Sequence, residues 1–171
     1  MNAGLFDLTG KNALVTGGAQ GLGRMIAEGL LRAGATVAIT SRKADICEAA
    51  AYEMAALGKC IALPADLSTP EAAVDLAQRY RETVGGTLHV LVNNAGKTWG
   101  GTVDTFPDKA WPGVMMVNVQ TPFTLVRELL PELTAAGTPD DPARVINIGS
   151  IAGATTAKLS AYSYSASKAA V

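Results

Sequence analysis

The sequence is poor in the residues that build metal sites and disulfide frameworks. Its 171 residues include one histidine and two cysteines, Cys47 and Cys60. Two cysteines this far apart in the chain do not form a disulfide scaffold or a metal knuckle. A single histidine, with no cysteines or carboxylates clustered at ligand spacing, also argues against a zinc site. We therefore expect no metal centre.

The chain also lacks long apolar runs and an excess of charge of either sign. No stretch approaches the roughly 20 apolar residues of a membrane-spanning helix. Lysine and arginine number 14, and aspartate and glutamate 15, so the charge favours neither nucleic acid nor an anionic membrane as a partner. The N-terminal stretch MNAGLFDLTGK has acidic and polar residues where a signal peptide has a basic and then an apolar segment. The expected location is the cytoplasm.

The sequence lacks the motifs of two classes of hydrolase. The single histidine, His89, lies in the apolar run LHVLV, where a packing role is favoured over a catalytic one. No serine stands in a G-x-S-x-G elbow, which argues against a Ser-His-Asp hydrolase. Gly18 and Gly23 have the P-loop spacing, but Arg24 and Met25 follow where Lys and Ser or Thr are required. ATP hydrolysis is therefore not expected.

What the sequence does have is a regular alternation of short apolar runs with longer amphipathic segments. The short runs are rich in Val, Ile or Leu and do not alternate with polar residues, as is typical of parallel strands buried on both faces. The expected strands are residues 13–16, 36–40, 60–63, 88–92 and 144–148. With 49% apolar and 17% charged residues, the chain is predicted to be one globular domain over residues 1–171.

Helical patterns lie between these runs. The helix after the first run is predicted to end at Gly34 and to bury one face. That face consists of Leu22, Met25, Ile26, Gly29 and Leu30. Further helices are expected at 44–57, from the capping sequence STPE at 68–71, and between 108 and 136, where three prolines predict two helices or one kinked helix. Such β-α repeats imply an α/β fold, a Rossmann-like doubly wound parallel sheet with right-handed crossovers.

A glycine-rich turn follows the first expected strand. Thr16 to Gly23 reads TGGAQGLG, and glycines between a strand and a helix let backbone N–H groups approach a pyrophosphate. An ordinary tight turn is the alternative, but the position after a strand and before an amphipathic helix is the context that a dinucleotide site requires. The candidate cofactor contacts in the turn are Gly17, Gln20, Gly21, Leu22 and Gly23.

The ends of the second and third strands bear on the choice of dinucleotide. An acid after the second strand would bind the ribose 2′-OH of NAD, whereas an arginine there accommodates the extra phosphate of NADP. Ser41 and Arg42 stand there, with no acid until Asp45, so NADP is favoured over NAD. A solvated loop arginine is the alternative. Asp66 and Leu67 follow the third strand at the same edge, where Asp66 could accept from the adenine amine or simply cap a helix.

Tyr164 and Lys168 are four residues apart, so a helix would place them on one face. Tyrosine is a weak acid, and an ammonium group one helical turn away favours its phenolate form. Reduction of a ketone needs a proton as well as a hydride, and a tyrosine so placed can supply that proton. A surface tyrosine beside a solvated lysine is the alternative. Tyr162, whose corresponding partner is Ala166, is expected to be a packing residue or pocket wall.

Together these motifs resemble those of the short-chain dehydrogenases/reductases. The likeness covers the whole chain in order. It consists of the turn at 16–23, the sequence NNAG at 93–96, Asn118 in VNV, Ser150, and Tyr164-x3-Lys168. The segments TSRKADICEAA, PADLS, NNAGKTWGG and PARVINIGSIAG are most similar to 3-oxoacyl-(acyl-carrier-protein) reductases, in particular to their rhamnolipid-associated branch.

The resemblance implies hydride transfer between NADP(H) and a ketone, such as a 3-oxoacyl thioester, to give a secondary alcohol. Tyr164 would donate the proton, Lys168 would bind the nicotinamide ribose, and Ser150 would steady the substrate oxygen. Asn118 would hold a water that relays protons to the lysine. The resemblance adds Asn94, Ala95 and Gly96 to the cofactor site, with Tyr164 and Lys168. A reductase of sugars, steroids or other small alcohols is an alternative, as is a nucleotide-binding module without turnover.

Family members continue past the tyrosine-lysine helix into another strand, a lid over the substrate and a final strand. This sequence lacks those C-terminal segments, so we expect it to be an incomplete record of a longer reductase. The fifth strand would then present a bare edge. The missing segments also build much of the subunit interface in the family, so the resemblance implies that the full-length protein is a homo-oligomer.

Overall fold

A five-stranded parallel sheet organises the part of the chain that the computed structural model describes, residues 4, 6–155 and 160–171. The N-terminal stretch that bears on a signal peptide therefore lies partly outside the described residues. The strand order is β3-β2-β1-β4-β5. The strands are β1 (Asn12–Val15), β2 (Thr36–Ile39), β3 (Cys60–Ala62), β4 (Val90–Asn93) and β5 (Arg144–Asn147). This order confirms the predicted Rossmann-like doubly wound sheet.

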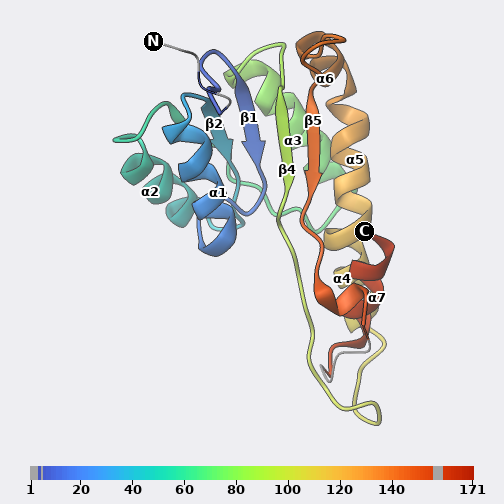
Figure 1. Ribbon diagram of the computed structural model, residues 1–171. Coiled ribbons are helices and arrows are strands. Elements are labelled where there is room, and N and C mark those ends of the chain that lie inside the picture. The colour runs from blue at the N-terminus through green and yellow to red at the C-terminus, as the bar shows by residue number, and fades with distance from the viewer. Residues whose placement is uncertain (1–3, 5, 156–159) are drawn as a thin grey trace.

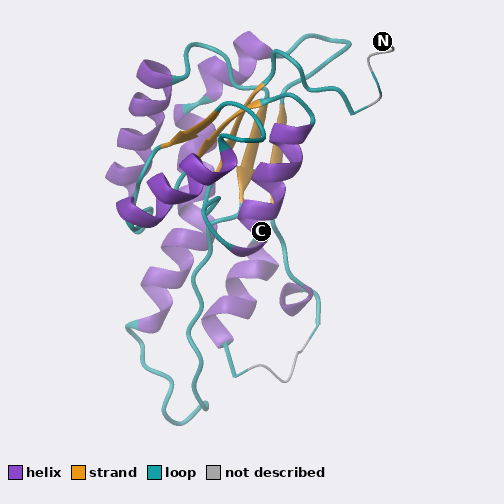
Figure 2. Cartoon of the chain, turned by 90° about the vertical axis from the view of Figure 1, so that its left-hand side faces the viewer, coloured by secondary structure: helices purple, strands orange, loops and turns teal. Residues whose placement is uncertain are grey.

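Helices cover both faces of the sheet (Figures 1 and 2). On one face, α1 (Gly21–Arg32) and α2 (Ala44–Met54) pack on Val15 and its neighbours. On the other, α3 (Pro70–Thr83) and α5 (Thr121–Glu128) pack on Leu14 and the residues level with it. Successive strand residues point to opposite faces, which is why the central strands are apolar throughout. No helix in the described part of the chain has the length and apolar character needed to cross a membrane.

The buried face of α1 differs from the prediction. Leu22 and Met25 are 53% and 69% exposed, whereas the buried residues are Gly23, Ala27 and Leu31. The helix turns its small residues towards the sheet because its N-terminus lies directly against the glycine turn. The prediction weighed side-chain hydrophobicity and missed that close approach, so it was wrong about Leu22, Met25 and Gly29, which are exposed, whereas Ile26 and Leu30 are partly buried against the core.

The edge strand β5 also departs from the prediction of strands buried on both faces. All four of its residues are exposed, because β5 pairs with β4 on one side and is the last strand of the described sheet. The expectation of a bare edge at the fifth strand agrees with this arrangement.

The proline-containing region after β4 forms a nearly continuous helix followed by a break. The segment α4 (Ala110–Met115) passes through a π-helical turn, η1 (Met116–Gln120), into α5, and α6 (Leu130–Ala136) begins after Leu129. Pro122 and Pro131 lie in the first turns of α5 and α6, where a missing N–H costs little. Both predicted alternatives are thus partly correct. The chain ends in a short 3₁₀ turn, η2 (Ile151–Gly153), and α7 (Tyr162–Ala170).

Thr16 joins the carboxyl ends of β1 and β4 with one buried hydroxyl. Its Oγ1 donates to the carbonyl oxygen of Val92 at 3.3 Å and accepts from the N–H groups of Asn94 at 3.0 Å and Ala95 at 2.9 Å. The Asn94 amide reaches back to the carbonyl oxygens of Thr16 at 2.9 Å and Gly17 at 3.3 Å. The glycine turn and the first residues after β4 are therefore held as one unit.

His89 joins the amino ends of β1, β4 and β5. Its Nδ1 accepts from the N–H of Asn12 at 3.0 Å, and its own N–H donates to the Asn12 carbonyl oxygen at 2.9 Å. The Arg144 N–H donates to the His89 carbonyl oxygen at 2.8 Å. Burial, followed by the nearby Lys11 ammonium, lowers the pKa of His89, and the Asp141 carboxylate opposes this in part. These contacts agree with the packing role expected for the histidine.

We expect the free energy of unfolding to decrease as the pH falls through about 6.5, the pKa of an unperturbed histidine. The lowered pKa of His89 means that the unfolded chain binds more protons in this range, so stability is retained above it and lost below it. Asp141 stays charged, because hydrogen bonds from Lys11 and then Arg144 lower its pKa to about 2. His89→Asn keeps an acceptor for Asn12 but cannot titrate. Urea unfolding should give the wild type a free energy of unfolding about 1 kcal/mol lower at pH 5 than at pH 8. In the variant the free energy of unfolding should depend less on pH. Equal slopes would contradict this role.

We expect Thr16→Val to lower the free energy of unfolding by about 1–3 kcal/mol, because it removes the acceptor of the Ala95 N–H and one of the two acceptors of the Asn94 N–H. Thr16→Ser retains the hydroxyl and is the matched control. Urea denaturation at neutral pH measures both variants. A valine variant as stable as the serine variant would show that the hydroxyl does not hold the two strand ends together.

Candidate active site

The glycine turn forms a cradle at the carboxyl edge of the sheet. Gly17 and Gly21 have φ of +65° and +53°, a conformation that favours glycine. A Cβ on Gly23 would overlap the carbonyl oxygen of Gly17, so only glycine lets α1 start this close to the turn. The N-cap residue Gln20 makes no side-chain cap, and the first turn of α1 has no acidic residue. The free N–H groups and the helix dipole can therefore receive an anion such as a pyrophosphate.

A hollow of about 670 Å³ extends from this turn across the ends of β2 and β3; we call it the nucleotide hollow. It brings together predicted residues from four separate segments. These are Gly17, Gln20, Ser41, Arg42, Asp66, Leu67, Ala95 and Gly96. The buried Thr40 hydroxyl, which also lines it, has no hydrogen-bond partner among the described residues. Three of the predicted turn residues, Gly21, Leu22 and Gly23, do not line it; Gly23 instead packs beneath the turn.

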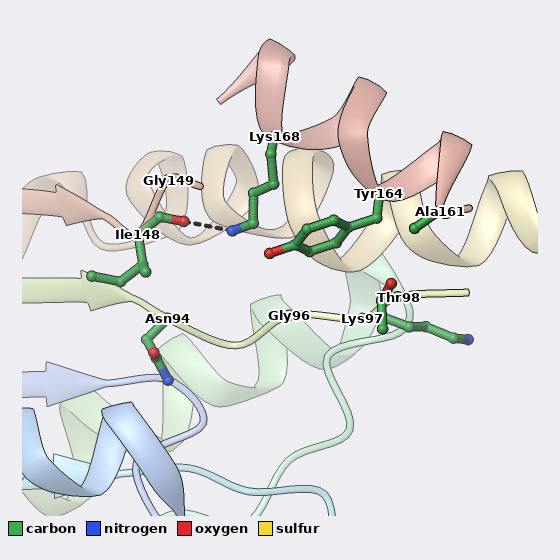
Figure 3. Close-up of a pocket in the computed structure, with 9 residues that line it drawn as sticks. All are labelled: Asn94, Gly96, Lys97, Thr98, Ile148, Gly149, Ala161, Tyr164 and Lys168. Atoms are coloured by element: carbon green, nitrogen blue, oxygen red, sulfur yellow. Dashed lines mark hydrogen bonds between the residues drawn. The ribbon is translucent and has the colours of Figure 1, made fainter. Parts of the chain in front are cut away.

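A second hollow, of about 480 Å³, lies between the strand that leaves β4 and helix α7; we call it the catalytic hollow. Figure 3 shows Asn94 and Gly96 on one side of it and Tyr164 and Lys168 on the other. Gly96 and the two residues after it line both hollows, so the two hollows adjoin each other along this segment.

Tyr164 and Lys168 lie on one face of α7, as their spacing predicts. The Lys168 Nζ is 5.9 Å from the centre of the Tyr164 ring and donates a hydrogen bond to the carbonyl oxygen of Ile148. The tyrosine hydroxyl points along the hollow towards the ammonium group (Figure 3). Tyr162 instead packs edge-on against Phe106, with ring centres 5.1 Å apart, as expected of a packing residue.

Ser150 lies at the start of η2, next to Gly149, which lines the catalytic hollow. Its Oγ accepts the N–H of Ala152 at 3.2 Å, which leaves the hydroxyl hydrogen available to donate. Ser150 does not itself line the hollow. It follows Gly149 in the chain and lies just after the carboxyl end of β5.

Asn118 is buried in the π-helical turn, and its amide links three segments. Its Oδ1 accepts from the N–H of Lys97 at 2.8 Å, and its Nδ2 donates to the Lys97 carbonyl oxygen at 2.9 Å and to Ser167 Oγ at 2.8 Å. Ser167 in turn donates to the carbonyl oxygen of Tyr164 at 2.7 Å. Both amide hydrogens are used, whereas the amide oxygen accepts one hydrogen bond and can accept a second from the water expected in a proton relay.

Sequence reasoning missed Thr16 and Ser167 as residues that hold the site together. The signal for Ser167 is its spacing from Ser163: both are fully buried on α7, on the side opposite a solvent-exposed face. For Thr16 the signal is weaker, because a threonine at the end of a strand has many roles. Neither residue touches the catalytic hollow, and both act by fixing residues that do.

The chain is similar along nearly all its length to proteins of one family. A family model described as short chain dehydrogenase matches residues 11–171. A rhamnolipids biosynthesis 3-oxoacyl-[acyl-carrier-protein] reductase of Pseudomonas aeruginosa is 47% identical over 166 residues, 97% of this chain. Ketoacyl reductase HetN of a Nostoc species is 36% identical over 166 residues, 95% of this chain. The chain spans 64% of the length of the first relative and 55% of the second.

Solved structures of similar proteins have the same fold as this chain. The Pseudomonas aeruginosa RhlG/NADP active-site complex has a TM-score of 0.93 at 47% identity, covering 96% of this chain and 64% of that one. A 3-oxoacyl (acyl-carrier-protein) reductase of Agrobacterium tumefaciens with NADP bound has a TM-score of 0.86 at 32% identity, covering 99% and 64%. Because the family match runs over residues 11–171 and includes both the glycine turn and the tyrosine-lysine helix, this chain belongs to the short chain dehydrogenase family.

Proposed function

We propose that the full-length protein is an NADP(H)-dependent oxidoreductase that reduces a ketone, in the form of a 3-oxoacyl thioester, to a secondary alcohol. One observation carries the proposal: Tyr164 and Lys168 face a hollow that adjoins the hollow at the glycine turn. The similarity to 3-oxoacyl reductases supports the choice of substrate. The expected substrate is a small ketone or an acyl thioester.

The residues of the nucleotide hollow fit an NADP molecule. The glycine turn, beneath which Gly23 packs, has room for a pyrophosphate. The buried Thr40 hydroxyl has no hydrogen-bond partner among the described residues and can bind the cofactor. Arg42 lines the nucleotide hollow just after β2, where an arginine accommodates the 2′-phosphate of NADP. It makes none of the ion pairs found among the described residues. Asp66 offers an acceptor for the adenine amine. NADP complexes among the similar structures support this choice over NAD.

The reduced nicotinamide supplies the hydride when it is bound, and the chain supplies the proton. Tyr164 donates its hydroxyl proton to the carbonyl oxygen as that oxygen becomes an alkoxide. The Lys168 ammonium stabilises the resulting phenolate and binds the ribose hydroxyls of the cofactor. The Ser150 hydroxyl donates a hydrogen bond to the same substrate oxygen. Asn118 acts by holding the loop at Lys97 and helix α7 in place.

We also propose that the full-length protein is a homo-oligomer. Large apolar side chains are exposed on three helices of the described chain: Trp111 on α4, Phe123 on α5 and Leu130 on α6. Exposed apolar surface of this extent is typical of interaction surfaces.

The proposed function is tested by following NADPH oxidation with a panel of ketones. The panel contains a 3-oxoacyl thioester, a keto-sugar acid and a steroid ketone. Turnover that is fastest with the thioester supports the proposal, whereas a preference for another ketone favours a different small-alcohol reductase. NADPH binding without turnover of any ketone would indicate a nucleotide-binding module.

We expect Tyr164→Phe to lower kcat by about 10²–10⁴-fold, the usual contribution of a general acid. The dissociation constant for NADPH should change little, because the ring is retained. Tyr162→Phe is the matched control, and its kinetics should stay close to wild type because Tyr162 contacts Phe106 outside the catalytic hollow. Unchanged turnover in Tyr164→Phe would mean that another group donates the proton.

We expect Arg42→Ala to raise the KM for NADPH by about tenfold, the effect of losing one charged hydrogen bond to phosphate. The KM for NADH should change little, because NADH lacks that phosphate. Lys43→Ala, one residue further along, removes the same charge from a residue that does not line the nucleotide hollow. If wild-type efficiency is equal with NADPH and NADH, Arg42 does not bind a phosphate.

A further inference from the structure

Two glycines in the described part of the chain lie against the backbone of another segment so closely that no Cβ fits. One is Gly23 in the cradle. The other is Gly153, at the end of η2, where a Cβ would lie 2.5 Å from the carbonyl oxygen of Lys168 and 2.6 Å from the nitrogen of Ala169. These atoms are backbone and cannot turn aside, so a side chain at 153 would have to displace the last turn of α7.

The same short segment holds Lys168 from a second direction. Residues 148–153, which we call the bracket, begin with Ile148, whose carbonyl oxygen accepts the hydrogen bond from Lys168 Nζ. Ser150 caps η2 in the middle of the bracket through the N–H of Ala152. Gly153 closes it against the Lys168 backbone. Ile148 therefore holds the ammonium group of Lys168, and Gly153 packs against its backbone; the two residues are five positions apart.

The bracket also carries Ser150, whose Oγ accepts the N–H of Ala152 between the two contacts with Lys168. One short segment therefore positions both the serine hydroxyl and the lysine ammonium group, and it sets the spacing between Ser150 and Lys168.

We propose that Gly153 is a positioning residue for Lys168, and that any side chain at this position moves the ammonium group away from Ile148 and Tyr164. Gly153 itself touches neither substrate nor cofactor. The proposal rests on the proposed function only in that Lys168 serves NADP(H) and Tyr164. The steric part, the hold of the bracket on Lys168, is independent of which reaction the protein performs.

A double-mutant cycle in the full-length protein tests the proposal. It compares wild type, Gly153→Ala, Lys168→Ala and the double variant, with kcat and KM for NADPH as readouts. Gly153→Ala should lower kcat/KM by about 100-fold, the effect of displacing a catalytic group by about 1 Å. In the Lys168→Ala background it should have almost no further effect, because the backbone contact remains but the ammonium group that it would displace is absent. Equal losses in both backgrounds would indicate general damage and overturn the proposal.

Gly29→Ala is the matched control, since a Cβ at this exposed helical glycine meets nothing within 4 Å. It should leave kinetics unchanged in both backgrounds. A crystal structure of Gly153→Ala gives a readout that needs no turnover: Lys168 Nζ should no longer contact the Ile148 carbonyl oxygen. An unmoved Lys168 would overturn the proposal. If the wild type reduces no ketone, the proposed function fails while this structure still decides the role of Gly153.

If Gly153→Ala does not accumulate as folded protein, Ala152→Gly takes its place in the cycle. This change loosens the bracket without adding an atom. It should lower kcat/KM in the wild-type background and not in the Lys168→Ala background. Wild-type kinetics in Ala152→Gly, together with an unfolded Gly153→Ala, would mean that the bracket supports folding alone, and the proposal would be wrong.

Discussion

The site depends on how closely the carboxyl ends of β1 and β4 approach each other. One threonine hydroxyl serves three backbone groups of the facing segment, and the Asn94 amide returns two hydrogen bonds to the glycine turn. These groups are shielded from water, so each must find its partner in the protein. The position of the turn, the start of α1 and the first wall of the catalytic hollow all follow from this one pairing.

A second set of contacts connects that edge to the tyrosine helix. The Asn118 amide holds the backbone of Lys97 on one side and Ser167 on the other. Asn118 is the buried residue of the π-helical turn, which lies directly before the proline-containing first turn of α5. Loop, long helix and α7 therefore cannot shift independently, and the two hollows keep a fixed relation.

Much of the fold could be predicted because it follows from local patterns. Five apolar runs gave the strands, and the tyrosine-lysine spacing gave one helix face, since both are set by the geometry of a few neighbouring residues. The exposed side of α1 could not be predicted in this way. Gly23 and Ala27 face the sheet because the helix backbone lies close to the glycine turn, and the local pattern does not show that approach. Asn118 and its partner Ser167 are 49 residues apart, and Gly153 meets a different helix, so no local pattern specifies these contacts.

The long reach of the Thr16 hydrogen bonds affects how the chain folds during synthesis. Thr16 and Val92 are 76 residues apart, so the unit from β1 to β3 leaves the ribosome well before the strand that completes it. Until then one edge of β1 is open, and the glycine turn lacks its partners. Because distant pairings of this kind form slowly, the cofactor cradle cannot take its final shape before β4 has been made and has paired with β1.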